Sequence, residues 1–316
     1  MKLLEPIVAW HHDISQIRRD IHAHPELAFE EFRTADVVAA KLEEWGIEIH
    51  RGLGGTGVVG IIRGDQPGER AVGLRADMDA LPMQEANTFD HASKHEGKMH
   101  ACGHDGHTAM LLAAARYLSQ HRDFAGTVYV IFQPAEEGGG GAKRMIDDGL
   151  FTRFPMEAVF GMHNWPGMKP GQFGVTAGPI MASSNEFSIV VKGKGTHAGM
   201  PNLGIDPVMA AVQLAQSLQT IITRNRNPLD AAVLSITQIH AGSADNVVPN
   251  HAELRGTVRT FTLDVLDLIE RRMEEIARHT CAAMDCEVQF TFQRNYPPTI
   301  NPVSYTHLTL PTILLV

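Results

Sequence analysis

The feature that most constrains the fold is an alternation of buried strands and helices between residues 47 and 163. Short apolar runs bounded by turn residues predict strands at 47–51, 58–63, 71–75, 127–132 and 158–161. Helical periodicity predicts helices at 6–22, 32–45, 107–120 and 142–148. This order predicts an α/β fold, with a mostly parallel sheet and helices on both faces.

Acidic and imidazole side chains directly follow three of these strands. The sequence continues as Ala76-Asp77-Met-Asp79 after the third strand, Gln133-Pro-Ala-Glu136-Glu137 after the fourth and Met162-His163-Asn164 after the fifth. Open parallel sheets bind ligands beyond the carboxyl ends of their strands. The sequence therefore predicts a functional site at this edge of the sheet.

A cluster of metal-binding residue types precedes the helix predicted at 107–120. Residues 99–110 contain Cys102 and His104, and the nearby strand ends add Glu137 and His163. One thiol combined with imidazoles and carboxylates differs from the paired cysteines of structural zinc sites and favours a catalytic site with open positions. A thiolate or carboxylate can also bridge two metal ions.

The adjacent carboxylates Glu136 and Glu137 cannot face one metal ion in the same way. We interpret Glu137 as the ligand and Glu136 as the general base. A nearby carboxylate raises the pKa of such a base toward neutrality, which suits proton transfer. A solvated loop is the alternative for this pair.

The roles of several neighbouring residues allow two interpretations. Asp105 and His107 are either ligands or residues that cap the helix or support the ligands, and Asp77 and Asp79 either support ligands or form a turn. His22 and His24 resemble helix-end residues, and a nucleophilic Cys102 is the weaker alternative to a ligand. The glycines of 52–57 match a dinucleotide-binding pattern, but a strand follows them, which favours a hairpin.

The pattern changes after about residue 180. Strand, helix, strand, strand, helix and strand are predicted over 185–191, 206–224, 231–240, 251–261, 264–283 and 286–292. This order is the split βαβ arrangement of a small α+β domain. We expect a catalytic domain over 1–180, a satellite domain over 181–295, a return to the catalytic domain over 296–302 and a non-native tail over 303–316.

Composition limits the location and partners of the chain. The net charge of −9 argues against nucleic acid or an anionic membrane as a partner. Three cysteines are too few for a disulfide framework and favour a reducing compartment. The first 20 residues lack a signal-peptide pattern, and no apolar run reaches the length of a membrane span. We expect a cytoplasmic protein.

Taken together, the motifs resemble those of the M20 metallopeptidase family, in particular its amidohydrolase branch of hippurate hydrolases and other N-acyl-amino-acid amidohydrolases. They occur in the order of the family between about residues 14 and 302. They are Arg18-Arg-Asp-Ile-His-Ala-His-Pro-Glu26, Arg75-Ala-Asp-Met-Asp-Ala-Leu-Pro82, Met99-His-Ala-Cys-Gly-His-Asp-Gly-His107, Phe132-Gln-Pro-Ala-Glu-Glu-Gly138, Gly161-Met-His-Asn164, Gly195-Thr-His-Ala-Gly199 and Asp245-Asn-Val-Val-Pro249.

The resemblance implies a binuclear centre with Cys102 as bridging thiolate and with His104, Glu137 and His163 as further ligands. It implies that Glu136 is the catalytic base acting on a metal-bound water, and that His197 stabilises the oxyanion, often in the active site of a dimer partner. Asn246 and Arg259 match positions that hold the substrate carboxylate. The expected cofactors are two divalent ions: zinc, manganese, cobalt or nickel.

The implied reaction is hydrolysis of the amide bond of N-benzoyl or N-acetyl amino acids, by a homodimer formed through the satellite domain. A dipeptidase or carboxypeptidase on the same scaffold is the alternative. The resemblance ends near Pro302, where the family continues for several dozen residues with one more ligand histidine. His307 matches no family segment, so an inactive, truncated fragment is the second alternative.

Overall fold

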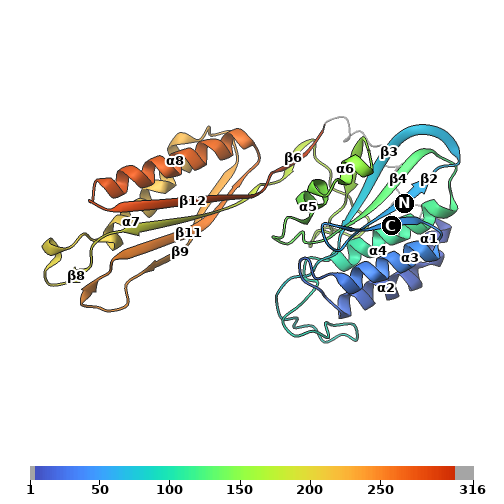
Figure 1. The fold of residues 1–316 in the computed structure, drawn as a ribbon, viewed down its shortest axis with the longest axis horizontal. Helices are drawn as coiled ribbons and strands as arrows, with labels where there is room; N and C mark the ends of the chain where they lie inside the picture. The colour runs from blue at the N-terminus through green and yellow to red at the C-terminus, as the bar shows by residue number, and fades with distance from the viewer. Residues whose placement is uncertain (1–3, 303–316) are drawn as a thin grey trace. The chain divides into compact units, whose positions relative to one another are not determined.

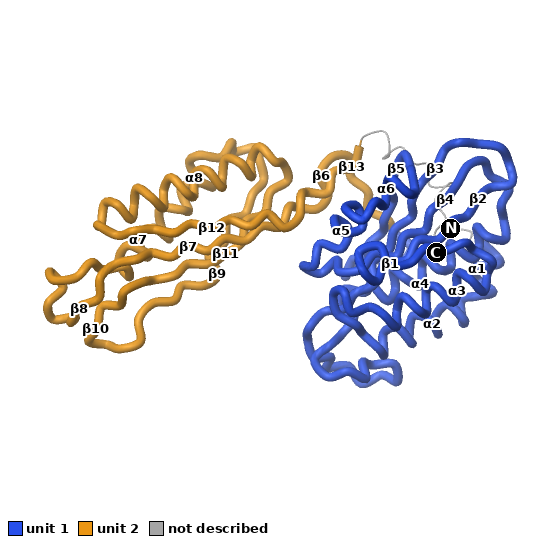
Figure 2. The backbone as a smooth tube through the Cα atoms, in the orientation of Figure 1, with its two compact units in different colours: residues 1–172, 309–316 blue, residues 173–308 orange. Residues whose placement is uncertain are grey.

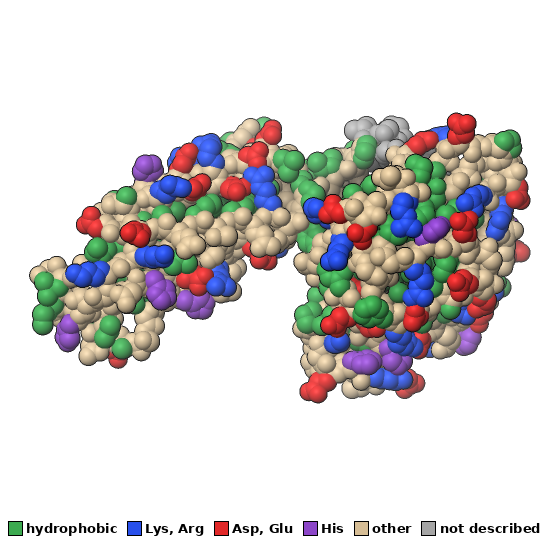
Figure 3. Space-filling model, in the orientation of Figure 1, with side chains coloured by type: hydrophobic (Ala, Val, Ile, Leu, Met, Phe, Trp, Pro, Cys, Tyr) green, Lys and Arg blue, Asp and Glu red, His purple; other side chains and the backbone are tan. Residues whose placement is uncertain are grey.

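A computed structural model describes residues 4–302 of the chain, and the tail expected at 303–316 lies outside the described residues. The described residues form two compact units, one ending at Gln172 and the other beginning at Phe173 (Figure 2). Acidic and basic side chains are interspersed on each unit in the view of Figure 3. None of the described helices combines the length and apolarity that crossing a bilayer requires.

The first unit contains a five-stranded sheet flanked by helices on both faces (Figure 1). Its helices are α1 (Glu5–Ala9), α2 (His11–Ala23), α3 (Phe32–Glu44), α4 (His104–Gln120), α5 (Gly141–Asp147) and α6 (Leu150–Arg153). Its strands are β1 (Glu48–Leu53), β2 (Gly57–Arg63), β3 (Gln66–Asp77), β4 (Ala125–Gln133) and β5 (Ala158–Gly161). The helix predicted over 6–22 is divided at Trp10 into α1 and α2.

The strand order is β1-β2-β4-β3-β5, and β4, β3 and β5 are mutually parallel. Only β2 runs against the others, because it pairs antiparallel with both β1 and β4. The β1–β2 hairpin therefore takes the place of the dinucleotide-binding turn that the glycines of 52–57 formally match. The predicted fold class, a mostly parallel sheet in an α/β unit, is confirmed.

The two faces of the sheet are buried by different helices because successive side chains of a strand point to opposite sides. Val130 and Phe132 of β4 pack with Leu42 of α3 and Leu112 of α4. Ile131, between them in the sequence, packs instead with residues of α5 and α6. Burial on both faces explains why β2 and β4 read as continuous apolar runs.

The second unit has the predicted β-α-β-β-α-β order. Its main elements are β7 (Ser184–Lys192), α7 (Pro207–Thr220), β9 (Ala232–Ala241), β11 (His251–Thr260), α8 (Leu263–Ala282) and β12 (Glu287–Tyr296). The short elements are β6 (Gly178–Met181), β8 (Thr196–His197), η1 (Pro201–Leu203), η2 (Ile221–Asn225), β10 (Val247–Val248) and β13 (Thr299–Asn301). The antiparallel sheet has the order β12-β7-β11-β9, and α7 and α8 pack on one face.

The predicted domain limits at residues 180 and 295 stay predictions. In the structure, β6 pairs with β13, so residues 178–181 and 299–301 are neighbours within the second unit.

Candidate metal centre

The candidate ligands and the candidate base meet at the carboxyl ends of β4, β3 and β5. Glu136 and Glu137 follow β4, His163 follows β5, and Asp77 is the last residue of β3. Cys102 lies just before α4, and His104 is the first residue of that helix. Because these strands are adjacent and parallel, residues as far apart in the sequence as Asp77 and His163 converge on one edge of the sheet.

Three groups of donor atoms, sharing His104, are close enough to hold a metal ion among the described residues. One group is Cys102, His104 and His163, and another is His104, Glu136 and Glu137; in each, the ligand atoms lie within 4.8 Å of one another. The third, buried group is Asp77, His104 and His107. The structure thus brings together the four ligands predicted from the sequence.

The two candidate imidazoles are oriented in the same way. His104 Nδ1 lies 3.2 Å from Asp79 Oδ1, and His163 Nδ1 lies 2.7 Å from the carbonyl oxygen of Asn164. Each ring therefore donates its Nδ1 hydrogen to an oxygen, which leaves Nε2 as the nitrogen that can bind a metal ion. Metal-binding histidines show this arrangement, in which the second nitrogen is held by a carboxylate or carbonyl.

The Nε2 atom of His104 tests whether a metal ion fits. This side chain is 0% exposed, and its Nε2 has no hydrogen-bond partner within residues 4–302. It lies 3.9 Å from Glu137 Oε1 and 4.0 Å from Glu136 Oε2. A buried polar atom without a partner is unfavourable unless something binds it. A divalent cation among these anionic and imidazole donors would satisfy it.

The charges around the site shift the pKa values of its groups. Burial lowers the pKa of His104, but the hydrogen bond to Asp79 and the charges of Asp77 and Asp79 outweigh it and raise the pKa to about 11. The neighbouring His104 imidazole lowers the pKa of the Cys102 thiol, yet burial and Glu137 give a net increase. Both groups hold protons that a metal ion would displace.

Glu136 differs from Glu137 in its surroundings. Burial raises the pKa of Glu136, and the negative charges of Glu137 and Asp77 raise it further. Its side chain is 39% exposed, against 24% for Glu137. A carboxyl group that is reachable from solvent and has a raised pKa is suited to accept and return a proton.

The sequence left two interpretations open for Asp77, Asp79, Asp105 and His107, and the structure gives the contacts of each. Asp79 holds His104, and Asp77 accepts a hydrogen bond of 2.6 Å from His107 Nδ1. Asp105 pairs with Arg18 and His22, and α4 has no side-chain cap hydrogen bond.

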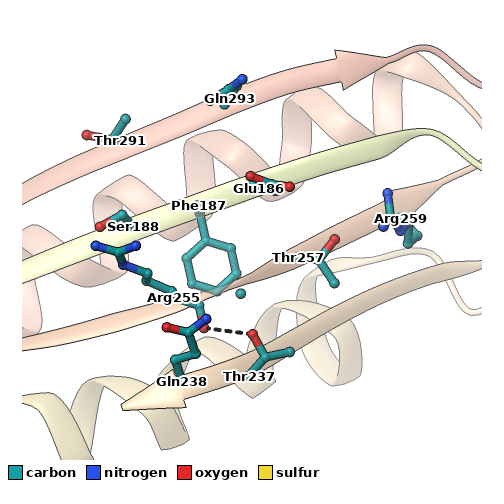
Figure 4. A pocket seen from close by; sticks show the side chains of 11 residues that line it. Glu186, Phe187, Ser188, Thr237, Gln238, Arg255, Thr257, Arg259, Thr291 and Gln293 are labelled. Atoms are coloured by element: carbon teal, nitrogen blue, oxygen red, sulfur yellow. Dashed lines mark hydrogen bonds between the residues drawn. The ribbon is translucent and has the colours of Figure 1, made fainter. Parts of the chain in front are cut away.

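Three further predicted site residues lie in the second unit. His197 of β8 pairs with Val247 of β10, and the Asn246 carbonyl accepts the N–H of Ala198 at 3.0 Å, so His197 and Asn246 are neighbours. Arg259 lies on β11, on the sheet face opposite α7 and α8. It lines a polar pocket with Arg255, Gln238 and Thr291 (Figure 4).

Comparison with known proteins places these observations in a family. The profile of "Peptidase family M20/M25/M40" matches residues 73–309. The chain is 43% identical to the hippurate hydrolase of Campylobacter jejuni over 301 residues, which are 95% of this chain and 78% of that protein. It is 43% identical to the N-acyl-L-amino acid amidohydrolase of Geobacillus stearothermophilus over 298 residues, 93% of this chain and 78% of the relative.

A solved structure agrees with these relatives. The Bacillus subtilis YXEP protein, described as a dinuclear metal binding peptidase from the M20 family, superposes with a TM-score of 0.82 at 39% identity. The match covers 94% of this chain and 77% of that protein.

Proposed function

The chain belongs to peptidase family M20/M25/M40 and is a metal-dependent amidohydrolase, and we propose that the site at the ends of β4, β3 and β5 is its catalytic centre. In this proposal Cys102, His104, Glu137 and His163 would hold two divalent ions. The observation that carries the proposal is the buried Nε2 atom of His104, which lacks a partner among the described residues and lies beside these donors.

The proposed substrates are N-acyl amino acids of the N-benzoyl or N-acetyl type. This rests on the names of the relatives, which at 43% identity include a hippurate hydrolase and an N-acyl-L-amino acid amidohydrolase. The reaction is hydrolysis of the amide bond between the acyl group and the amino acid nitrogen.

Divalent ions bound to these ligands would polarise the amide carbonyl and lower the pKa of a bound water. Glu136 accepts the proton of the attacking water and later returns it to the amine nitrogen of the leaving amino acid. Burial raises its pKa, which supports this role because a less acidic carboxyl group holds the proton more readily before it returns it. The negative charge of the adjacent Glu137 carboxylate also raises the pKa of Glu136.

We assign the remaining predicted residues to substrate contacts. His197 stabilises the developing oxyanion, and Asn246 and Arg259 hold the substrate carboxylate. The support for His197 and Asn246 acting together is their proximity across the β8–β10 pairing. The support for Arg259 is its guanidinium group in a polar pocket, since guanidinium groups bind carboxylates with two parallel hydrogen bonds.

A Glu136→Gln variant tests the proposal. It should lose turnover of N-acetyl and N-benzoyl amino acids by about 10²–10⁴-fold, the usual contribution of a general base. Its metal content should match that of the wild type, because the substitution removes no proposed ligand. The control is Glu157→Gln, an exposed carboxylate paired with Arg70. Full activity of the Glu136 variant would contradict the assignment.

A substrate panel separates the amidohydrolase from the peptidase alternative that the family name includes. Faster hydrolysis of N-acyl amino acids than of dipeptides supports the proposal, and the reverse order supports a dipeptidase or carboxypeptidase.

We further propose zinc, manganese, cobalt or nickel as the metal, a homodimer as the assembly and the cytoplasm as the location. Zinc, manganese, cobalt and nickel all accept thiolate and imidazole ligands. The proposed homodimer forms through the second unit, whose edge strands β9 and β12 each have one neighbour in their sheet. The free thiols of Cys102, Cys281 and Cys286 support a reducing, cytoplasmic location.

A further inference from the structure

A buried carboxylate outside the metal centre is bonded to the chain directly before Glu136. Glu31 is 0% exposed and precedes α3. Its Oε1 accepts the backbone N–H of Ala135 at 2.8 Å and that of Phe29 at 3.1 Å. Its Oε2 accepts the hydroxyl of Thr56 at 2.6 Å. One side chain therefore joins three segments that are distant in the sequence.

The two backbone groups that Glu31 binds belong to residues in an uncommon conformation. Phe29 has φ 64° and Ala135 has φ 51°, and Asp285 is the only other non-glycine residue with positive φ in the described part of the chain. Residues other than glycine adopt this left-handed region at a steric cost and need support from their surroundings. Glu31 provides that support to both residues through one oxygen atom.

Ala135 sets the direction in which Glu136 leaves β4. Its N–H is held by Glu31, and its carbonyl accepts the N–H of Gly141 at 3.0 Å. A Cβ atom on Gly139 would meet the Ala135 Cβ at 2.7 Å, so the loop closes tightly around Ala135. The N–H and the carbonyl of Ala135 are both hydrogen-bonded and its side chain is buried, so the backbone directly before Glu136 is held in place.

We propose that Glu31 is a positioning residue for the reaction: by holding Ala135 in the left-handed conformation, it places the Glu136 carboxylate for proton transfer. The inference rests on the proposed role of Glu136. Glu31 acts through hydrogen-bond acceptance and not through charge. Glutamine should replace it, since the amide oxygen can accept both N–H groups while the amide nitrogen donates to the Thr56 hydroxyl.

Steady-state kinetics of the metal-loaded enzyme with an N-acetyl amino acid test this proposal. Glu31→Met keeps the volume and removes the acceptors, and we expect kcat to fall about 100-fold, as misplacement of a reacting group by about 1 Å can cause. KM and metal content should stay close to the wild-type values. Glu31→Gln should keep kcat within about threefold, because it keeps the acceptor of Ala135 N–H.

Glu26 provides a matched control. Its carboxylate also accepts two backbone N–H groups and one threonine hydroxyl, those of Arg33 and Thr34 at the start of α3, without contacting the loop of Ala135. Glu26→Met should lower the melting temperature as Glu31→Met does, yet keep kcat. A similar kcat for the two methionine variants, or an equal loss in Glu31→Gln and Glu31→Met, would overturn the proposal.

Two further variants keep the test decisive. If Glu31→Met does not fold, Glu31→Asp retains a buried acid but is one methylene too short to reach Ala135, and its kcat should fall about tenfold. An unchanged kcat in Glu31→Asp would overturn the proposal. Glu136→Gln measured in parallel distinguishes the two claims: an active Glu136→Gln rejects the base itself, whereas an inactive Glu136→Gln with an active Glu31→Met rejects only the positioning role.

Discussion

The carboxylate of Asp79 accepts the backbone N–H of Glu137 at 2.8 Å through Oδ2, while its Oδ1 lies 3.2 Å from His104 Nδ1. One buried side chain therefore orients two of the candidate ligands, which lie on α4 and after β4. The residue is 1% exposed, so its charge is balanced by these contacts and not by solvent.

Asp79→Asn should weaken metal binding because His104 and the Glu137 N–H bind different carboxylate oxygens, and an amide keeps only one of these two atoms as an acceptor. Loss of a carboxylate behind a metal-binding histidine typically lowers affinity by about 10–100-fold. The measurement is competition with a metal-sensitive chelator. The control is Asp148→Asn, in which the lost carboxylate also accepts a backbone N–H, that of Gly54 at 2.8 Å, without touching the candidate ligands. Equal affinities in the two variants would contradict the role of Asp79.

Gly103→Ala should disrupt the turn between Cys102 and His104. Gly103 has φ 90°, and an added Cβ would meet the Asn164 side chain at 2.7 Å. Gly55 has φ 96° with no atom within 4 Å, so Gly55→Ala carries the backbone cost of about 1–2 kcal/mol without the collision. We expect Gly103→Ala to lower metal affinity by about tenfold or more, as loss of ligand support does. Unfolding and chelator competition measure both effects.

The prediction is contradicted if Gly103→Ala and Gly55→Ala reduce the free energy of unfolding equally and both variants keep wild-type metal affinity. The contact with Asn164 would then not affect metal binding.

A pH-dependent stability is expected from His22. Its Nδ1 lies 2.9 Å from Asp105 and its Nε2 3.2 Å from Glu85. The hydrogen bond to Asp105 raises the pKa of His22 above 6.5, although burial opposes the shift. Burial raises the pKa of Asp105, but His22 and neighbouring charges lower it overall, below 3.8. The pair is thus most favourable with His22 protonated and Asp105 ionised.

A raised histidine pKa contributes stability that is complete below 6.5 and is lost as the pH rises through the folded-state value. The lowered Asp105 pKa contributes stability that is complete above 3.8 and is lost as the pH falls through the folded-state value. His22→Gln should therefore cost most between these values, about 1.5–3 kcal/mol for a hydrogen bond between charged groups. Urea unfolding of the metal-free protein across this range measures it. His50→Gln, which removes an exposed pair with Glu48, should show little pH dependence, and a pH-independent cost in His22→Gln would refute the prediction.

The sheet and the meeting of the ligands could be predicted because they follow from local pattern and topology. Continuous apolar runs predicted the strands, and parallel neighbours carry their last residues to one edge. Cys102 and His104 could be predicted as ligands of one site because they are close together in the sequence. The start of α4 was predicted three residues late, because Gly103, a left-handed N-cap, lacks the side-chain acceptor that usually marks a helix start.

The supporting contacts could not be predicted in the same way. Glu31 binds a backbone group 104 residues away, and Ala135 adopts a conformation that its residue type disfavours. Asp79 read equally well as a turn residue, since its two hydrogen bonds depend on where α4 and the end of β4 lie in space. Such contacts arise from the path of the backbone, and residue type alone does not encode them.

The division of the chain has a functional consequence. The proposed ligands and base all precede residue 173, whereas His197, Asn246 and Arg259 follow it. Under the proposed assignment, substitutions in the second stretch would alter contacts to the oxyanion and the substrate carboxylate while leaving the metal ligands and the base unchanged, so separate sets of mutations would vary substrate preference and metal binding.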